Sequence, residues 1–216
     1  AEASRRVESA ARLPFDLTGG PLVRGQVLKL SDEEHAVVLT MHHIVTDGWS
    51  FGVAGRELAV LYQAFREGKS SPLPVPEIQY ADYSVWQRGR LRGQFLDNLL
   101  SFWTKRLEGL HVLELPTDRP RPAVRSGRGG LRLFRVPDDL SASLRAIGRA
   151  EGATPYMTLL AAFQALLFRH SGQCDFAVGS PVANRGRAEV EGLIGYFINM
   201  LVLRADLSGD PSFQEL

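Results

Sequence analysis

Residues suited to proton transfer and acyl chemistry gather in the stretch 42–48, which contains His42, His43, Asp47 and Gly48. An imidazole can accept and return a proton, and an unobstructed glycine N–H can stabilise a developing oxyanion. These two groups close together are the minimum that acyl transfer requires. A structural pair of hydrogen-bonded histidines would use the same residue types, but four such residues at fixed spacing favour function.

The two histidines are expected to have different roles, because consecutive residues at a strand end point to opposite sides. One can face a cleft while the other packs inward. Adjacent histidines on a strand do not readily converge on one ion, so we predict no metal site here. A short loop lets His43 and Asp47 share one neighbourhood, and Asp47 directly precedes a predicted helix, where negative charge is favoured.

Two strands and a helix are predicted to position this loop. Residues 22–30 alternate apolar and polar side chains, which indicates a half-buried strand, and the polar residues 31–34 indicate a hairpin-type turn after it. Residues 35–41 are apolar almost throughout, which indicates a central strand covered on both faces. The helix at 51–65 follows, with Ser50 as its expected N-terminal cap and Leu58 and Phe65 on its apolar face.

A change in composition divides the chain into two predicted lobes. Residues 116–130 contain prolines followed by glycines, with arginines at 119, 121, 125 and 128, and are expected to form a solvated linker. We therefore predict an N-terminal lobe at 1–115 and a C-terminal lobe at 131–216. The second lobe should hold a strand at 131–136, a helix at 138–151 and a strand at 197–203. A second helix should start at Thr154 and Pro155, with the threonine as its cap, and end at Gly172. The second of these helices is apolar nearly all round at 157–168, so we expect it to be buried.

The bulk composition excludes several classes of protein. The chain has 216 residues, of which 44% are hydrophobic and 23% charged, and its formal net charge is +1, so neither disorder nor a nucleic-acid partner is indicated. The single cysteine, Cys174, excludes an internal disulfide framework and fits a reducing cytoplasm. No apolar run approaches membrane-spanning length, and no signal core follows the first charges, so we expect neither a membrane nor a secreted protein.

Several motifs resemble those of the condensation domains of nonribosomal peptide synthetases. The sequence HHIVTDGWS at 42–50 is similar to the family signature HHxxxDGWS. Further matches in the family's order are FDL at 15–17, GPL at 20–22, YADYSVWQ at 80–87, LPTDRPRP at 115–122, GSPVANR at 179–185 and IGYFINMLVLR at 194–204. The resemblance therefore spans nearly the whole chain.

The resemblance implies an α/β fold, a mixed-sheet α+β sandwich like that of chloramphenicol acetyltransferase, with two lobes in a V. It implies peptide-bond formation in a tunnel between the lobes. An upstream donor and a downstream acceptor peptidyl carrier protein would present the substrates on phosphopantetheine arms, so no cofactor of the domain's own is expected. Adenylation domains would be neighbours in the same assembly line.

The resemblance also implies roles for individual residues. His43 matches the family's second histidine, which acts as a base or orients the amine, and Gly48 contributes its N–H near the tetrahedral intermediate. Asp47 matches a structural acid, with Arg185 as the candidate partner, and His42 is assigned a packing role. Asn199 would approach the same site from the second lobe. An ordinary solvated arginine is the alternative for Arg185, and a structural hydrogen bond is the alternative for Asn199.

Compared with the family, the chain lacks the first strand and helix and stops soon after the strand bearing Asn199. We therefore expect both lobes to be incomplete and this piece alone to be inactive. Trp49 and Ser50 after the glycine favour the subtype that joins two L-configured residues. A non-catalytic recruitment module of the same fold is one alternative, and the intact motifs count against it. A stand-alone acyl-CoA transferase is another, which the synthetase-specific motifs outside 42–50 disfavour. An epimerising relative, which uses a similar cluster, stays a minor alternative.

Overall fold

The computed structural model describes residues 2–124, 126–127 and 129–216. These residues form two compact units, which are described separately: the first comprises Ala1–Asp97 and Pro181–Asn199, and the second comprises Asn98–Ser180 and Met200–Leu216. This division differs from the expected lobes, because 181–199 joins the N-terminal residues and 98–115 joins the later ones. Arg125 and Arg128 of the expected linker lie outside the described residues. The lobe boundaries therefore stay a prediction.

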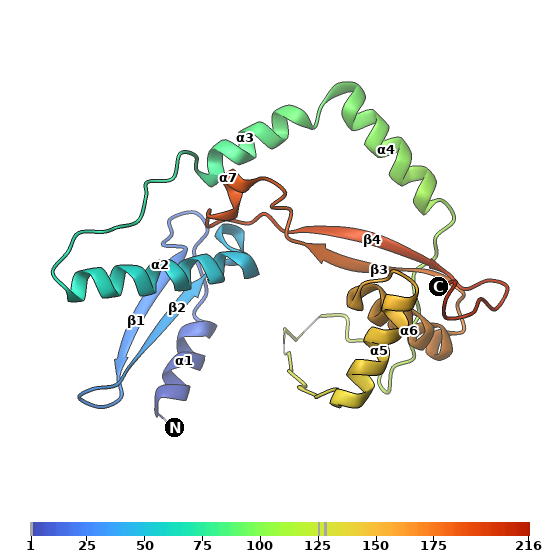
Figure 1. Ribbon diagram of the computed structural model, residues 1–216, viewed down its shortest axis with the longest axis horizontal. Helices are drawn as coiled ribbons and strands as arrows, with labels where there is room; N and C mark the ends of the chain where they lie inside the picture. Colours follow the sequence, from blue (N-terminus) through green and yellow to red (C-terminus); the bar gives the residue numbers. More distant parts are fainter. Residues whose placement is uncertain (1, 125, 128) are drawn as a thin grey trace. The chain divides into compact units, whose positions relative to one another are not determined.

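A helix and a hairpin open the first unit (Figure 1). Helix α1 (Glu2–Arg12) lies beside β2 (His35–Met41), which pairs in antiparallel fashion with β1 (Val23–Lys29). In the register of the pair, Val23 lies opposite Met41, and Lys29 lies opposite His35. The Leu30 N–H donates to the Glu34 carbonyl at 2.8 Å and closes the turn. The two predicted strands and the polar turn between them are confirmed.

The predicted burial of the second strand is wrong. Within the described part of the chain, β2 hydrogen-bonds to β1 alone, and Val37 and Leu39 remain 57% and 37% exposed. An apolar run indicates that both faces of a strand favour burial, but it does not indicate which segment packs against them. The strand nevertheless ends where expected, directly before His42.

The remaining elements of the first unit surround the loop that follows β2. They are the short 3-10 helix η1 (His43–Val45), α2 (Gly48–Arg66), α3 (Tyr80–Arg90) and α7 (Ala188–Glu191). A core of Tyr83, Val190, Leu193 and Phe197 joins α3 to the segment around α7. Helix α2 begins earlier than predicted and is capped by Asp47 instead of Ser50. Its expected apolar face is wrong in part, because Leu58 and Phe65 are 48% and 59% exposed.

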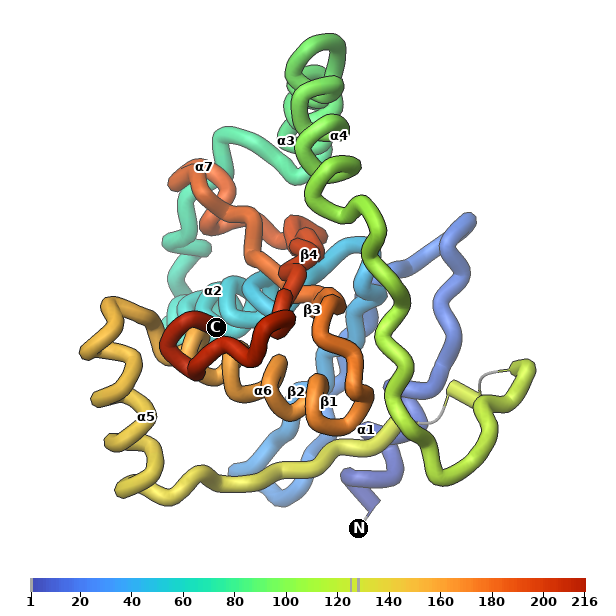
Figure 2. The backbone as a smooth tube through the Cα atoms, turned by 90° about the vertical axis from the view of Figure 1, so that its right-hand side faces the viewer, coloured from blue at the N-terminus to red at the C-terminus, as the bar shows by residue number. Residues whose placement is uncertain are grey.

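The second unit contains two packed helices and a two-stranded sheet. Helix α4 (Gly93–Leu107) crosses the division between the units, and α5 (Asp138–Ala150) packs on α6 (Pro155–Ser171), as Figure 2 shows. Strands β3 (Asp175–Val182) and β4 (Asn199–Asp206) pair with each other. Thr154 caps α6 by accepting from the Met157 N–H, and Gly172 ends the helix at a φ of 72°. Both helices after the linker and both ends of α6 are thus confirmed.

Two predictions for the second unit are wrong. Residues 131–136 form no strand, and Leu131, Leu133 and Phe134 are 82%, 86% and 88% exposed. Helix α6 is not buried all round, since Leu159 and Phe163 are 53% and 45% exposed. Its buried side is formed by Thr158, Ala161, Gln164 and Leu167. Apolar composition indicated a helix with cover on every side, whereas α5 and the sheet cover it only in part.

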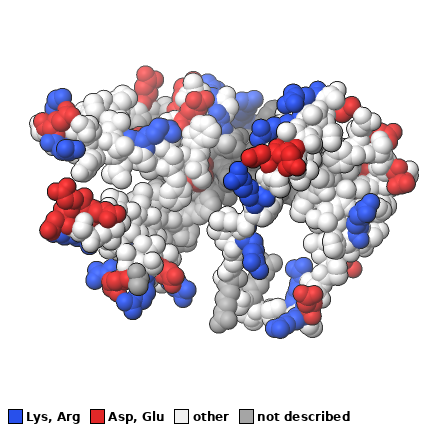
Figure 3. All heavy atoms as spheres, turned by 60° about the horizontal axis from the view of Figure 1, so that its bottom comes forward, with Lys and Arg blue, Asp and Glu red and all other residues white. Residues whose placement is uncertain are grey.

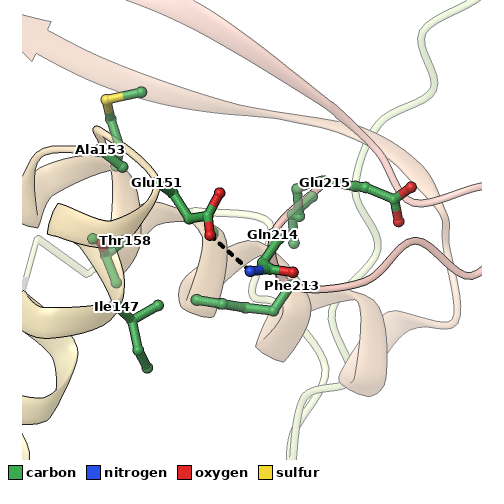
Figure 4. A pocket seen from close by; sticks show the side chains of 11 residues that line it. Ile147, Glu151, Ala153, Thr158, Phe213, Gln214 and Glu215 are labelled. Atoms are coloured by element: carbon green, nitrogen blue, oxygen red, sulfur yellow. Dashed lines mark hydrogen bonds between the residues drawn. The ribbon is translucent and has the colours of Figure 1, made fainter.

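The surface offers a pocket that is separate from the predicted site. A pocket of about 240 Å³ lies among α5, α6 and residues 213–216 (Figure 4), where the Gln214 side-chain amide donates to Glu151 at 2.7 Å. It contains none of the residues to which the sequence assigned chemistry. On the face shown in Figure 3, basic and acidic side chains are interspersed between wide uncharged areas. None of the described helices is long and apolar enough to cross a bilayer.

Candidate active site

The His43 imidazole lies in η1 with its hydrogen-bonding roles fixed. Its Nδ1 is 2.6 Å from the carbonyl oxygen of Thr46. A carbonyl can only accept a hydrogen bond, so Nδ1 carries the proton and Nε2 of the neutral ring keeps its lone pair. Among the residues that the structure describes, Nε2 has no hydrogen-bond partner, and His43 is exposed. His43 therefore presents a basic nitrogen to the surroundings.

The neighbouring His42 adopts the opposite arrangement. Its Nδ1 accepts the Ile44 N–H at 3.0 Å, so the proton of the neutral ring is on Nε2. The ring packs edge-to-face on Phe15 with centroids 5.5 Å apart. The two adjacent imidazoles thus hold different tautomers. Only His43 has its unprotonated nitrogen free of a backbone donor.

Asp47 is the N-cap of α2 and lies at the centre of a buried network. Its Oδ1 accepts the Ser50 N–H at 2.8 Å and lies 2.7 Å from the Ser50 hydroxyl, while its Oδ2 accepts the Phe197 N–H at 3.1 Å. The residue is 1% exposed. A carboxylate without solvent requires such donors, because an unpaired buried charge is costly. Asp47 therefore joins the start of α2 to a segment 150 residues further along the chain.

Arg185 provides the opposite charge. Its guanidinium lies 3.2 Å from Oδ1 of Asp47, and the two side chains are 1% and 2% exposed. The other terminal nitrogen of the guanidinium donates to the carbonyls of Val190 and Leu193 at 2.6 and 2.8 Å. The group also stacks 4.0 Å from the centre of the Phe197 ring. Its Nε has no hydrogen-bond partner within the described part of the chain. The structure thus brings together the two residues that the motifs suggested as partners.

Ser50 belongs to the same network, although the sequence suggested only a cap. Its fully buried hydroxyl accepts the Gly195 N–H at 3.1 Å and an Arg185 N–H at 3.0 Å, and it lies 2.9 Å from the Gly195 carbonyl. The three-residue spacing from Asp47 to Ser50 is that of a capping arrangement, which is a local signal. The bonds to 195 had no such signal, because they join residues 145 positions apart.

The environment of Asp47 favours its ionised form. Burial acts to raise the pKa of this carboxyl, but the hydrogen bonds from Ser50 and Phe197 and the charge of Arg185 outweigh burial, and the pKa lies below its ordinary value. In the unfolded chain these partners are lost and the carboxyl ionises normally. Ionised Asp47 therefore stabilises the folded state.

This linkage predicts a loss of stability in acid. Because the folded pKa is the lower one, the contribution of Asp47 is complete above the unfolded pKa of about 3.9 and is lost as the pH falls through the folded value. One such group lowers the free energy of unfolding by up to about 1.4 kcal/mol per pH unit in that window. Denaturant titrations between about pH 6 and about pH 3 should show this slope, and Asp47→Asn should reduce it. An unchanged slope in Asp47→Asn would assign the acid sensitivity to other carboxylates.

Gly48 and Asn199 are the remaining predicted site residues. Gly48 is the first residue of α2, so its N–H has no acceptor within the helix, and a Cβ at this position would meet no atom within 4 Å. The fold of the described residues would therefore accommodate a larger residue than glycine at position 48. Asn199 is exposed at the start of β4, and no hydrogen bond joins it to His43 or Asp47 in the described part of the chain.

Nothing in this arrangement resembles a metal centre. Within residues 2–124, 126–127 and 129–216, no three His, Cys, Asp or Glu side chains gather as a metal site would require. The chemistry on offer is a basic imidazole nitrogen in η1 and the N–H of Gly48, which opens α2 and has no acceptor within that helix. A buried ion pair behind them fixes the loop between β2 and α2 to residues 190–197.

The sequence of the chain matches a known protein family and several curated proteins. The sequence profile described as "Condensation domain" matches residues 1–216. A linear gramicidin synthase of Brevibacillus parabrevis is 49% identical over 211 residues, which are 97% of this chain and 3% of that protein. Chondramide synthase of Chondromyces crocatus is 48% identical over 214 residues, which are 99% of this chain and 6% of that protein. The chain thus spans a small part of these curated relatives.

Solved structures share the fold. The X-domain in the complex of the X-domain and OxyB from teicoplanin biosynthesis superposes with a TM-score of 0.91 at 31% identity, covering 99% of this chain and 48% of that one. The four-domain nonribosomal peptide synthetase holo-AB3403, bound to AMP and glycine, gives a TM-score of 0.84 at 26% identity and covers 99% of this chain and 16% of that one.

Proposed function

We propose that this chain, which belongs to the condensation-domain family of nonribosomal peptide synthetases, forms peptide bonds between substrates carried as thioesters. Its α/β fold is that of the family. The observation that carries the proposal is the hydrogen bond from His43 Nδ1–H to the Thr46 carbonyl, which leaves Nε2 of the neutral ring with its lone pair, shortly before the N–H of Gly48 that opens α2. A base and an oxyanion donor are the groups that aminolysis of a thioester needs.

The proposed step transfers an acyl group from sulfur to nitrogen. The amine of a carrier-bound acceptor attacks the carbonyl carbon of the donor thioester, and Nε2 of His43 binds the amine and takes its proton. The Gly48 N–H stabilises the oxyanion of the tetrahedral intermediate. The carbon–sulfur bond then breaks, and the departing thiolate of the donor's phosphopantetheine arm receives the proton. An amide and a free thiol are the products.

The other site residues have supporting roles in this proposal. Asp47 and Arg185 fix the loop from behind, since both are buried and neither can reach a substrate. His42 packs on Phe15. Asn199 binds the substrate in this proposal. Substrates come from an upstream donor and a downstream acceptor carrier protein, with an adenylation domain nearby, and the joined residues are both L-configured. The free thiol of Cys174 fits a cytoplasmic location.

A recruitment module is the second candidate, and the likeness to an X-domain solved in complex with OxyB favours it. A module that only binds a partner has no need of a base with a fixed tautomer. The Thr46 carbonyl fixes the tautomer of His43, and this geometry favours catalysis over pure recruitment. An epimerising relative would use a similar cluster on a single carrier-bound residue, so the products separate the three functions.

The test is a condensation assay on the complete domain that contains this chain. Donor and acceptor carrier proteins loaded with defined L-amino acids are mixed with the domain, and mass spectrometry follows the carrier-bound products. A dipeptide on the acceptor carrier is the expected result. Inverted configuration of a single loaded residue would instead indicate epimerisation. Carrier or partner binding without any change in the loaded groups would indicate recruitment.

Gly48→Ala tests whether the glycine is needed for the reaction or for folding. The new methyl group meets no protein atom within 4 Å, so the free energy of unfolding should change by less than about 1 kcal/mol. The same methyl group narrows the approach to the Gly48 N–H, and the condensation rate should fall on the order of 100-fold. Single-turnover kinetics and denaturant unfolding check the two parts. An unchanged rate would remove Gly48 from the proposed oxyanion site.

A further inference from the structure

We infer that Tyr196 is a positioning residue for His43, an inference that rests on the proposed function of the same site. The Tyr196 ring packs edge-to-face on the His43 imidazole, with centroids 5.2 Å apart and an interplanar angle of 78°. Tyr196 is 42% exposed, and His43 is exposed as well. The sequence motifs assigned no role to this residue.

His43 needs a second restraint because its hydrogen bond holds only one edge of the ring. The Nδ1–H bond to the Thr46 carbonyl selects the tautomer, but the imidazole can still tilt about that contact. A flat aromatic ring against its side limits this tilt and fixes the direction of Nε2. An edge-to-face aromatic pair is strong enough for this purpose, because such pairs stabilise beyond the area they bury.

The backbone of Tyr196 is held on both sides. The Gly195 N–H donates to the Ser50 hydroxyl at 3.1 Å, and the Phe197 N–H donates to Asp47 at 3.1 Å. The Tyr196 carbonyl itself accepts a hydrogen bond from the Tyr80 hydroxyl at 2.7 Å. Tyr196 therefore sits at a fixed place relative to the first turn of α2. The buried network of Asp47 and Ser50 acts on His43 through this residue.

Close packing around Gly195 supports the same conclusion. A Cβ on Gly195 would lie 2.4 Å from a ring carbon of Tyr80, so no larger residue fits without moving that ring. Moving the ring would break the bond from Tyr80 to the Tyr196 carbonyl. Gly195 thus permits the hydrogen bond from the Tyr80 hydroxyl to the Tyr196 carbonyl, which fixes Tyr196.

The ring of Tyr196, and not its hydroxyl, carries the proposed role. No hydrogen bond from this hydroxyl is found among the described residues, whereas the ring contacts the imidazole directly. Phenylalanine should therefore replace tyrosine with little loss, and alanine should not. A residue that only stabilised the fold would not show this difference in the properties of His43.

The experiment compares Tyr196→Phe and Tyr196→Ala in the complete domain, with Tyr62→Ala as a matched control. Tyr62 lies on α2 and is 68% exposed, so its loss removes a tyrosine ring that does not contact His43. We expect Tyr196→Ala to lower kcat about tenfold with KM changed less than about twofold. Tyr196→Phe and Tyr62→Ala should both stay within about twofold of the parent.

A second readout does not depend on turnover. Nitrogen-15 NMR relaxation of labelled histidine reports how far the His43 ring moves on the picosecond-to-nanosecond timescale. The parent, Tyr196→Phe and Tyr62→Ala should show a restrained ring, and Tyr196→Ala should show a more mobile one, with the Nδ1–H form kept in all four because the Thr46 carbonyl selects it. Unchanged mobility of the His43 ring in a folded Tyr196→Ala protein would overturn the inference. If the parent forms no dipeptide, the proposed function fails, while the relaxation data still decide whether Tyr196 positions His43.

Discussion

Replacing His43 by alanine in the complete domain is expected to lower the rate of dipeptide formation by a factor of about 10² to 10⁴, the usual contribution of a positioned proton acceptor. The variant loses the nitrogen that takes the amine proton, and the unprotonated nitrogen of the adjacent imidazole, Nδ1 of His42, is already occupied by the Ile44 N–H. Carrier docking should persist, since the ring is exposed and its one hydrogen bond goes to the local Thr46 carbonyl. Single-turnover mass spectrometry measures the rate, and binding of loaded carriers is measured separately.

His42→Ala is the matched control for this prediction. It removes an adjacent imidazole whose Nδ1 is already occupied by the Ile44 N–H. We expect this variant to lose packing against Phe15 and to retain a condensation rate within about tenfold of the parent. Undiminished condensation by His43→Ala would contradict the acyl-transfer role of His43. Equal losses in both variants would show that the loop, and not one nitrogen, was disturbed.

Asp47→Ala is expected to destabilise the domain by about 3–5 kcal/mol, the cost of breaking a buried ion pair on one side. The substitution leaves the Arg185 guanidinium, whose side chain is 1% exposed, without its counter-charge. It also removes the acceptor of the Ser50 and Phe197 N–H groups. Chemical denaturation, together with the yield of folded protein, measures the loss.

Two further variants make this prediction specific. Asp175→Ala breaks the ion pair of Asp175 and Arg204, whose side chains are 31% and 22% exposed, and should cost much less because water can solvate the remaining charge. Asp47→Ala combined with Arg185→Met should recover part of the stability, since no uncompensated charge stays buried. A stable but inactive Asp47→Ala protein would show that Asp47 takes part directly in the chemistry.

Local patterns in the sequence predicted the local features of the structure. The alternation at 22–30, the polar turn and the Thr154–Pro155 start of α6 all depend on neighbouring residues, and the structure has all of them. The expected cover of β2, the strand at 131–136 and the full burial of α6 were wrong. Each depended on what packs against the segment, and periodicity does not contain that information.

The candidate site shows the same limit. The motif of residues 42–50 drew attention to His43, Asp47 and Gly48, because their chemistry is readable from residue type and spacing. Tyr196 and the second role of Ser50 became visible only in three dimensions, since their contacts join residues more than a hundred positions apart. No local pattern marks such a contact.

The distance along the chain between Asp47 and its partners has a consequence for synthesis. The ion pair joins residues 138 positions apart, and the bond to the Phe197 N–H spans 150. At a translation rate of about 5–20 residues per second, the ribosome adds those residues over roughly 7–30 s after Asp47 has been made. The nascent chain therefore carries this carboxylate unpaired for that time, and closing so long a loop is a slow, late folding event. A nascent chain stalled before residue 185 holds the signature motif in full and still lacks both Arg185 and the Phe197 N–H, the two distant partners of Asp47.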